Sequence, residues 1–454
     1  MLEIVNPTTK QLITKLPEDT RETLAQAYKA AKTAQRAWAK VPVAERIATI
    51  ARWKERVAKD RQRLAEILTG EMGKPLQQSL NELDALSGRV DFFLEHTAKL
   101  LEEEVVQTGA TEERIAWEPL GVIANISAWN YPYFVGSNVF VPALLTGNAV
   151  LYKPSELTTQ TGLAIGELLH EAGVPKDVFR VVVGGGAVGA ALAEQPVDGI
   201  FFTGSYATGK RIAEAVAGRL IKLQLELGGK DPAYVAEDAD AKVAAESLAD
   251  GAMYNAGQSC CSVERIYVHE KVAAPFIAAF VATVKGFVVG DPRELGTYIG
   301  PLARAQQLEV LETQVKDALA KGAKLLVGGK RDAARDGWFE PTVLVDVTND
   351  MKVMRDESFG PIIGIQVVKS DDEAIERMND TEYGLTAGVY TKDRARAEAV
   401  LHAVDAGSAY WNCCDRVSPR LPWTGRRHSG IGSTLSTHGI RTFVQPKGWH
   451  LRAP

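Results

Sequence analysis

Apolar residues recur at helical spacing through the first part of the chain. Residues 22–40 are rich in Ala, Gln, Lys and Leu, and apolar positions at the same spacing follow over 44–68 and 80–104. Glycines and a Gly-Lys-Pro at 73–75 separate these segments. The pattern predicts three helices before any strand of a central sheet.

From residue 121 the pattern changes to short apolar runs that alternate with helical segments. The runs that predict buried strands are 121–126, 149–152, 179–183, 199–202 and 221–225. The segments that predict helices between them are 158–172, 187–193 and 207–217. Such alternation is typical of a parallel sheet that is covered on both faces.

A second alternating series follows from Ala233. Its predicted strands continue at 265–268, 324–327, 362–368 and 387–390, with a helix at 272–285. We therefore predict an α/β protein of two successive units, with the segment 226–231 as the hinge between them. At the end of the chain, 442–444 and 449–452 predict a short strand and a tail without a covering helix. An exposed strand of this kind pairs readily with another subunit, so we expect a homodimer or homotetramer.

Composition narrows the class of protein. The chain of 454 residues is 46% hydrophobic and 24% charged, with a net charge of −5, which is ordinary for a globular protein of two to three domains. No basic run predicts a nucleic-acid partner. The N-terminus has no signal-peptide pattern, and Pro142 and Gly147 interrupt the most apolar stretch, 139–152. We expect no membrane partner and a cytoplasmic location.

The four cysteines form two adjacent pairs, at 260–261 and 413–414. Neighbouring cysteines form a disulfide only with strain, so reduced thiols are the default. Neither pair has the two-residue gap typical of a zinc site. We predict no metal.

Three separated stretches carry the parts of one covalent redox reaction. Gly-Gln-Ser-Cys at 257–260 supplies a thiol, Glu-Leu-Gly-Gly-Lys at 226–230 a carboxylate, and Trp-Asn-Tyr-Pro at 129–132 an amide. Oxidation of an aldehyde through a thioester needs a nucleophile, a base that activates water and an oxyanion donor. Each residue also has a simpler interpretation. Cys260 fits a small core position, Glu226 an ion pair with Lys230, and Asn130 a turn before proline.

With these motifs, the chain resembles the aldehyde dehydrogenase superfamily, in its NAD(P)-dependent, non-acylating form. The resemblance runs from Asn6-Pro7 to the Ser-Gly-Ile-Gly at 429–432. It implies that Cys260 attacks an aldehyde, that Asn130 and the backbone N–H of Cys260 hold the oxyanion, and that Glu226 activates water. Glu226 favours release of a free acid over transfer to coenzyme A. Arg265 is expected to be structural.

The resemblance also implies a division of the chain. A Rossmann-like dinucleotide-binding domain would comprise 1–103 and 119–228, and a second α/β domain, the catalytic one, 229–436. A small β oligomerisation element would comprise 104–118 and 437–454.

Candidate cofactor residues lie at two predicted strand ends and in one later turn. The glycine-rich 184–189 only approximates a dinucleotide motif, whereas Phe-Thr-Gly-Ser at 202–205 turns from a strand into a helix. Ser205 suits a pyrophosphate oxygen or an ordinary N-cap. By resemblance, Lys153 and Glu156 bind the adenosine ribose, otherwise forming a surface ion pair, and Glu156 favours NAD over NADP. NADP stays open because Lys153 and Ser155 tolerate its phosphate. The full predicted set is Trp129, Lys153, Ser155, Glu156, Gly204, Ser205, Glu357 and Phe359.

The substrate side departs from the family pattern. Residues 422–430 read Pro-Trp-Thr-Gly-Arg-Arg-His-Ser-Gly, where relatives usually have Pro-Phe-Gly-Gly-x-Lys-x-Ser-Gly. Trp423 thus stands in place of Phe, in a loop that lines the substrate entrance in relatives. The tunnel candidates are Tyr131, Val135, Asn138, Ser259, Cys261, Arg416, Val417, Arg420 and Trp423.

The aldehyde itself stays open at this stage. Arg416 and Arg420 either receive a substrate carboxylate, which favours a semialdehyde such as succinic semialdehyde, or are solvated loop charges. An aliphatic or aromatic aldehyde, a coenzyme A-acylating activity and a non-catalytic descendant are the alternatives. Oxidation of Cys260 with Cys261, Cys413 or Cys414 is a further hypothesis.

Overall fold

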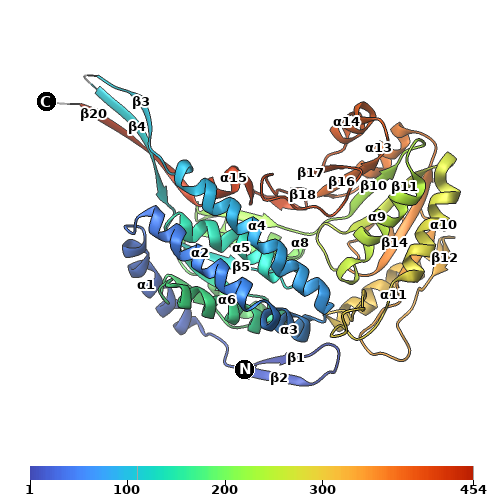
Figure 1. Ribbon diagram of the computed structural model, residues 1–454, viewed down its shortest axis with the longest axis horizontal. Coiled ribbons are helices and arrows are strands. Elements are labelled where there is room, and N and C mark those ends of the chain that lie inside the picture. Colours follow the sequence, from blue (N-terminus) through green and yellow to red (C-terminus); the bar gives the residue numbers. More distant parts are fainter. Residues whose placement is uncertain (110, 453–454) are drawn as a thin grey trace.

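The computed structural model describes residues 1–109 and 111–452. Two sheet-centred units lie side by side, with the chain crossing from one to the other between β9 and β10 (Figure 1). The predicted α/β class is confirmed.

Four helices precede the first sheet: α1 (Arg21–Trp38), α2 (Val43–Lys59), α3 (Arg61–Met72) and α4 (Leu76–Leu100). The single helix expected over 44–68 was wrong, because the chain leaves helical geometry at Asp60 (φ −99°, ψ 12°). Gly73, with φ 79°, ends α3 in the left-handed conformation that glycine adopts without strain. The helix expected over 80–104 begins earlier, at Leu76, and ends at Leu100.

The first sheet has the order β19-β9-β8-β5-β6-β7. Its strands are β5 (Val122–Ile126), β6 (Ala149–Lys153), β7 (Phe179–Val181), β8 (Gly199–Thr203), β9 (Lys222–Glu226) and β19 (Gly430–Ile431). Its helices are α5 (Pro132–Leu145), α6 (Thr159–Ala172), α7 (Gly186–Ala193) and α8 (Tyr206–Val216), with a 3-10 turn η1 (Glu156–Thr158). All strands but β19 are parallel. The strand order reverses at β5, so a ligand crevice is expected above the carboxyl ends of β5 and β8.

Helix α5 was not expected from the sequence. It is buried on all sides and contains Pro142, so it lacks the polar face that identifies a surface helix.

The second sheet has the order β12-β13-β14-β11-β10-β16-β17. Its strands are β10 (Asp231–Val235), β11 (Val263–His269), β12 (Lys324–Val327), β13 (Thr342–Val345), β14 (Ile362–Val368), β16 (Thr386–Tyr390) and β17 (Ser408–Trp411). The helices around it are α9 (Ala241–Met253), α10 (Glu270–Gly286), α11 (Ala305–Ala320), α12 (Lys352–Arg355), α13 (Asp371–Asn379) and α14 (Arg394–Ala403). Because β9 ends at Glu226 and β10 begins at Asp231, the connection lies where the hinge was predicted.

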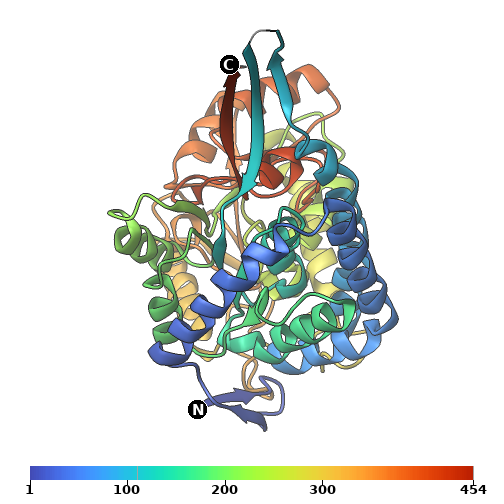
Figure 2. The ribbon, with the colours of Figure 1, turned by 90° about the vertical axis from the view of Figure 1, so that its left-hand side faces the viewer.

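A third sheet, β20-β4-β3, projects from the body of the molecule (Figure 2). It comprises β3 (Glu104–Gln107), β4 (Thr111–Pro119) and β20 (Val444–Arg452). The short strand expected at 442–444 was wrong for residues 442 and 443, because one continuous strand, β20, begins at Val444 and includes the expected tail 449–452. Pro446 is accommodated because β20 is an edge strand, where a missing N–H breaks no ladder.

Smaller elements complete the chain. These are β1 (Leu2–Val5), β2 (Leu12–Leu16), η2 (Tyr254–Gly257), β15 (Tyr383–Gly384), β18 (Arg426–Arg427) and α15 (Ser436–Arg441). No helix within the described residues is both long enough and apolar enough to span a bilayer.

Candidate active site

The segment before Cys260 has an unusual backbone. Asn255, Ala256 and Gly257 have φ values of 54°, 55° and 70°, all left-handed. A Cβ on Gly257 would lie 2.2 Å from the carbonyl oxygen of Gly360, so only glycine fits. Left-handed conformations of other residues cost free energy and persist where the surroundings impose them, often at functional sites.

Hydrogen bonds hold this segment in place. The Asn255 amide donates to the carbonyls of Gln258 (3.1 Å) and Asn130 (3.3 Å). The Gln258 side-chain oxygen accepts from the N–H of Ala303 (2.9 Å). Nδ2 of Asn130 also donates to the Gln258 carbonyl (3.2 Å), which places this amide beside the backbone that leads into Cys260. The N–H of Cys260 has no hydrogen-bond partner among the described groups.

Two cavities meet at this segment, with volumes of about 650 Å³ and about 620 Å³. Of the described residues, Cys260 and Glu226 are the only ones that line both cavities. The thiol and the carboxylate therefore stand where the two spaces adjoin, although β9 and the loop before β11 supply them from different sheets.

Burial governs the ionisation of both groups. Glu226 lies at the end of β9 and is 4% exposed. Its burial raises the pKa of its carboxyl above the ordinary value, opposed by a hydrogen bond from Trp423 and the charge of Arg89. The neighbouring thiol of Cys261 favours the Cys260 thiolate, but burial and nearby carboxylates outweigh it and raise the pKa of Cys260. The Glu226 carboxyl and the Cys260 thiol therefore each ionise at a higher pH than the same group does in water.

The alternative ion pair of Glu226 with Lys230 was wrong. Lys230 Nζ pairs with Glu264 Oε2 at 2.6 Å instead, and both side chains are buried. Glu264 also accepts from the backbone N–H groups of Ser358 and Phe359. Arg265, expected to be structural, is buried and donates to the carbonyls of Lys230 (2.8 Å) and Met378 (3.0 Å), so that expectation is confirmed.

The cavity of about 620 Å³ lies at the switch point of the first sheet and gathers all eight predicted cofactor residues, together with Asn130. Ser205 caps α8, its Oγ accepting from the N–H of Thr208 (3.4 Å). Lys153 is 3% exposed and its Nζ lies 3.9 Å from Glu156, so the interpretation of these two as a surface ion pair was wrong for Lys153. Arg211, Arg304 and Gln307 also line this cavity and were not predicted.

Glu357 and Phe359 line the same cavity. Glu357 Oε1 accepts from the N–H of Gly229 (3.1 Å), and burial with the charge of Glu264 raises the pKa of Glu357 to about 8. Phe359 packs edge-on against Trp129, with ring centroids 5.4 Å apart. An aromatic wall and a hydrogen-bonding carboxyl therefore face the space beside Cys260.

The donor set of this cavity fits a nicotinamide dinucleotide. The N-terminus of α8 and Ser205 suit phosphate oxygens, and Lys153 and Glu156 suit ribose hydroxyls.

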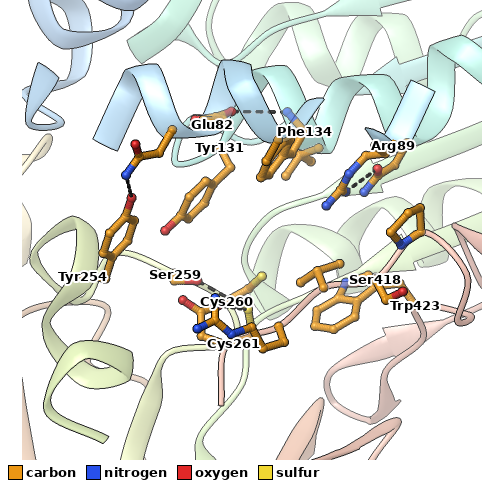
Figure 3. A pocket seen from close by; sticks show the side chains of 18 of the residues that line it. Glu82, Arg89, Tyr131, Phe134, Tyr254, Ser259, Cys260, Cys261, Ser418 and Trp423 are labelled. Atoms are coloured by element: carbon orange, nitrogen blue, oxygen red, sulfur yellow. Dashed lines mark hydrogen bonds between the residues drawn. The ribbon is translucent and has the colours of Figure 1, made fainter. Parts of the chain in front are cut away.

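The cavity of about 650 Å³ is lined by all nine predicted tunnel residues (Figure 3). Trp423 is buried and its indole Nε1 donates to Glu226 Oε1 (2.7 Å). Tyr131 lies under the ammonium of Lys74, 3.7 Å from the ring centroid. Arg416 and Arg420 are exposed at the rim.

Sequence reasoning missed the charged groups that α4 contributes to this cavity. Glu82 and Arg89 are seven residues apart on α4, and both are buried. Polar residues repeating on the buried face of a helix could have identified them, because buried charges need a partner or a function. Asp415 and Tyr254 also line this cavity and were not predicted.

All four cysteines are free. Sγ of Cys261 donates to Asp415 Oδ1 (2.9 Å), and Sγ of Cys414 to the Ser247 carbonyl (3.4 Å). Cys413 lines neither of the two cavities that meet at Cys260. In the described part of the chain no three His, Cys, Asp or Glu side chains cluster closely enough to hold a metal ion.

Comparison with known proteins agrees with this geometry. A sequence model described as the aldehyde dehydrogenase family matches residues 1–448. A Mycolicibacterium smegmatis protein, provisionally named a succinate-semialdehyde dehydrogenase (NADP(+)), is 38% identical over 95% of this chain and 85% of its own. The peroxisomal aminoaldehyde dehydrogenase 2 of Malus domestica is 35% identical over 98% of this chain and 91% of its own. The crystal structure of an NADP-dependent enzyme from Escherichia coli has a TM-score of 0.97 at 31% identity, covering 100% of this chain and 95% of its own.

Proposed function

The chain belongs to the aldehyde dehydrogenase family, and on this premise we propose that it oxidises its aldehyde through a covalent bond to Cys260. The enzyme is an NAD(P)-dependent oxidoreductase. Cys260, as a thiolate, adds to the carbonyl carbon and gives a thiohemiacetal. The observation that supports this assignment best is that, of the residues that the structure describes, only Cys260 and Glu226 line both cavities.

Two donors are proposed to stabilise the oxygen of the thiohemiacetal. Asn130 Nδ2 lies by the Cys260 backbone through its bond to the Gln258 carbonyl, and its second N–H remains to bind the oxygen. The Cys260 N–H, which has no partner among the described groups, supplies the other. Such a donor is typically worth about 3–4 kcal/mol of transition-state stabilisation.

Glu226 is proposed as the base of the second half-reaction. Trp129, Glu357 and Phe359 line the cavity of about 620 Å³ beside Cys260 and would hold a nicotinamide ring there, which would supply the hydride acceptor. The thiohemiacetal on Cys260 would then become a thioester. Glu226 then takes a proton from water as the water attacks the thioester. The C–S bond breaks, the acid leaves and Cys260 is regenerated.

The test is a panel of aldehydes assayed with NAD and with NADP. Purified protein should reduce the nucleotide in proportion to the aldehyde consumed and release the free acid without coenzyme A. Strict dependence on coenzyme A would favour the acylating alternative. If neither NAD nor NADP were reduced with any aldehyde of the panel, the proposal would be contradicted.

A mild preference for NAD is proposed, with NADP also accepted. The Glu156 carboxylate repels a 2′-phosphate, while Lys153, Ser155 and Arg211, which line the same cavity, attract it. Glu156→Gln should therefore raise kcat/KM for NADP relative to NAD. An unchanged ratio would show that Glu156 does not select the nucleotide.

An aldehyde with a distal carboxylate, such as succinic semialdehyde, is the proposed substrate. Arg416 and Arg420 line the mouth of the cavity of about 650 Å³, which we call the substrate cavity, and would attract an anion. The name of the Mycolicibacterium smegmatis relative supports this class, whereas that of the Malus domestica relative favours an ammonium-bearing aldehyde.

The domain division and the oligomer are also proposals. The first sheet supports assigning 1–103 and 119–228 to the dinucleotide, although β19 joins it from the segment 229–436 assigned to catalysis. The β20-β4-β3 sheet supports the assignment of 104–118 and 437–454 to oligomerisation. Sedimentation should give a dimer or tetramer, and deletion of 444–454 should release monomers.

A further inference from the structure

Arg89 lies deep in the wall of the substrate cavity rather than at its rim. It extends from α4 on the side opposite Trp423 and Ser418 (Figure 3) and is 5% exposed. Its Nη1 donates to Asn138 Oδ1 (2.6 Å), and its guanidinium lies 4.2 Å from the centroid of the Phe134 ring. Two side chains therefore fix the plane of this cation.

Most donors of Arg89 lack a partner. No carboxylate of the described residues lies within 4.0 Å of its nitrogens, and its one hydrogen bond leaves Nε and Nη2 unused. Burial lowers the pKa of Arg89 to about 10, with the charges of Glu226 and Glu82 opposing, so the guanidinium is charged at neutral pH. A buried charge without a counter-ion is costly unless a ligand supplies one.

The carboxylates nearest to Arg89 already have other partners. Glu82 pairs with Lys74 (2.6 Å) and accepts from the backbone N–H groups of Tyr133 and Phe134 at the start of α5. Glu226 accepts from Trp423. Two further carboxylates line the same cavity: Asp250 accepts from Tyr298 and Asp415 from Cys261. Arg89 is thus the buried cation of this cavity that has room for an additional anion.

We propose that Arg89 binds the distal carboxylate of an ω-carboxy aldehyde and is the main specificity determinant of the substrate cavity. A guanidinium presents parallel N–H donors that match the two oxygens of a carboxylate. At a desolvated site this pairing is worth more than at the exposed Arg416 and Arg420, where water screens the charge. The inference rests on the proposed function and assigns its recognition step to a residue that the sequence did not single out.

The experiment compares succinic semialdehyde with butanal, which has the same carbon number and no carboxylate. The readout is the ratio of their kcat/KM values. In Arg89→Met this ratio should fall at least 30-fold, mainly through KM for succinic semialdehyde. Arg89→Lys, which keeps the charge without the fork, should give an intermediate ratio, and Arg416→Met and Arg420→Met smaller losses. Lys99→Met, which removes an exposed cation of the same helix, should leave the ratio unchanged.

Three other results would each contradict either the inference or the proposed function. In one, kcat/KM falls equally for both substrates in Arg89→Met and Arg89→Lys while the thermal transition stays at the wild-type temperature. Arg89 would then act only through its charge on Glu226, and the inference would be overturned. A preference of the wild type for 4-aminobutanal over succinic semialdehyde would assign the cavity to cations and also overturn it. A wild type that oxidises no aldehyde would instead contradict the proposed function.

Discussion

The indole Nε1 of Trp423 donates a hydrogen bond to Oε1 of Glu226 across 2.7 Å, and both side chains are buried. The loop after β17 and the end of β9 are nearly two hundred positions apart (|i−j| = 197). Phenylalanine, which the family pattern has at this position, cannot make this bond. The bond favours the carboxylate form of Glu226 and opposes the effect of its burial.

Trp423→Phe should therefore separate the two half-reactions. Without the indole donor, the pKa of Glu226 should rise further, because burial then acts with less opposition. The pH at which steady-state turnover reaches half its maximum should shift upward, since the base acts as a carboxylate. Rapid-mixing measurements should find the first burst of reduced nucleotide largely retained.

The other groups that face Glu226 make this prediction specific. They are Arg89 of α4, Thr203 of β8, whose Oγ1 lies 3.5 Å from Oε2, and Cys260. None of them changes in Trp423→Phe. An unchanged pH profile would mean that the indole serves only as an aromatic wall.

Cys260→Ala should abolish nucleotide reduction with every aldehyde, because no other described residue at the junction of the two cavities carries a thiol. Cys261→Ala is the matched variant, since Sγ of Cys261 turns to Asp415 and the variant should still form the covalent intermediate. Mass spectrometry of acid-quenched protein should detect the acyl adduct in Cys261→Ala and not in Cys260→Ala. An adduct in both would move the nucleophile elsewhere.

Glu226→Gln should keep the hydride burst and slow the release of acid. General base catalysis typically contributes about 10²–10⁴-fold, so steady-state turnover should fall by at least about 10²-fold on that basis. The acyl-enzyme should then accumulate and be visible by mass spectrometry. Full steady-state turnover in this variant would require another base.

The burst rate should rise with pH from neutral to alkaline conditions. The thiolate of Cys260 is the proposed attacking form, and the neighbouring thiol of Cys261, which favours it, is outweighed by burial and nearby carboxylates, which raise the pKa of Cys260. Raising the pH increases the thiolate fraction, so the sign of the slope is positive. The rate of iodoacetamide labelling of Cys260 measures the same titration independently.

Gly257→Ala should lower both stability and activity. The left-handed conformation alone costs an L-residue ~1–2 kcal/mol, and the new Cβ would meet the Gly360 carbonyl at 2.2 Å. Gly286→Ala is the control, because nothing lies within 4 Å of its added Cβ. The temperature of the unfolding transition should fall for Gly257→Ala and stay unchanged or rise for Gly286→Ala. Equal transitions for the two variants would show that the loop adapts freely.

The sequence by itself determined the α/β class and the connection between the two sheets, and it identified the three residue types that we propose for the reaction. It did so because these depend on local signals: strand–helix alternation, glycines next to the thiol and the carboxylate, and a serine where a strand turns into a helix. The prediction of helices failed where the local pattern of apolar and polar residues is ambiguous. The break at Asp60 lies inside an uninterrupted helical periodicity, and α5 has no polar face to identify it.

The tertiary structure alone decided which groups face each other. Three features depend on how β9, α4 and the loop after β17 pack. They are the separation of Lys230 from Glu226, the hydrogen bond from Trp423 to Glu226, and the position of Arg89 in the wall of the substrate cavity. No spacing along the chain encodes these contacts, because burial and partner choice arise only when distant segments exclude water together. The ionisation of Glu226 and the charge preference that we propose for the cavity are therefore properties of the packed structure.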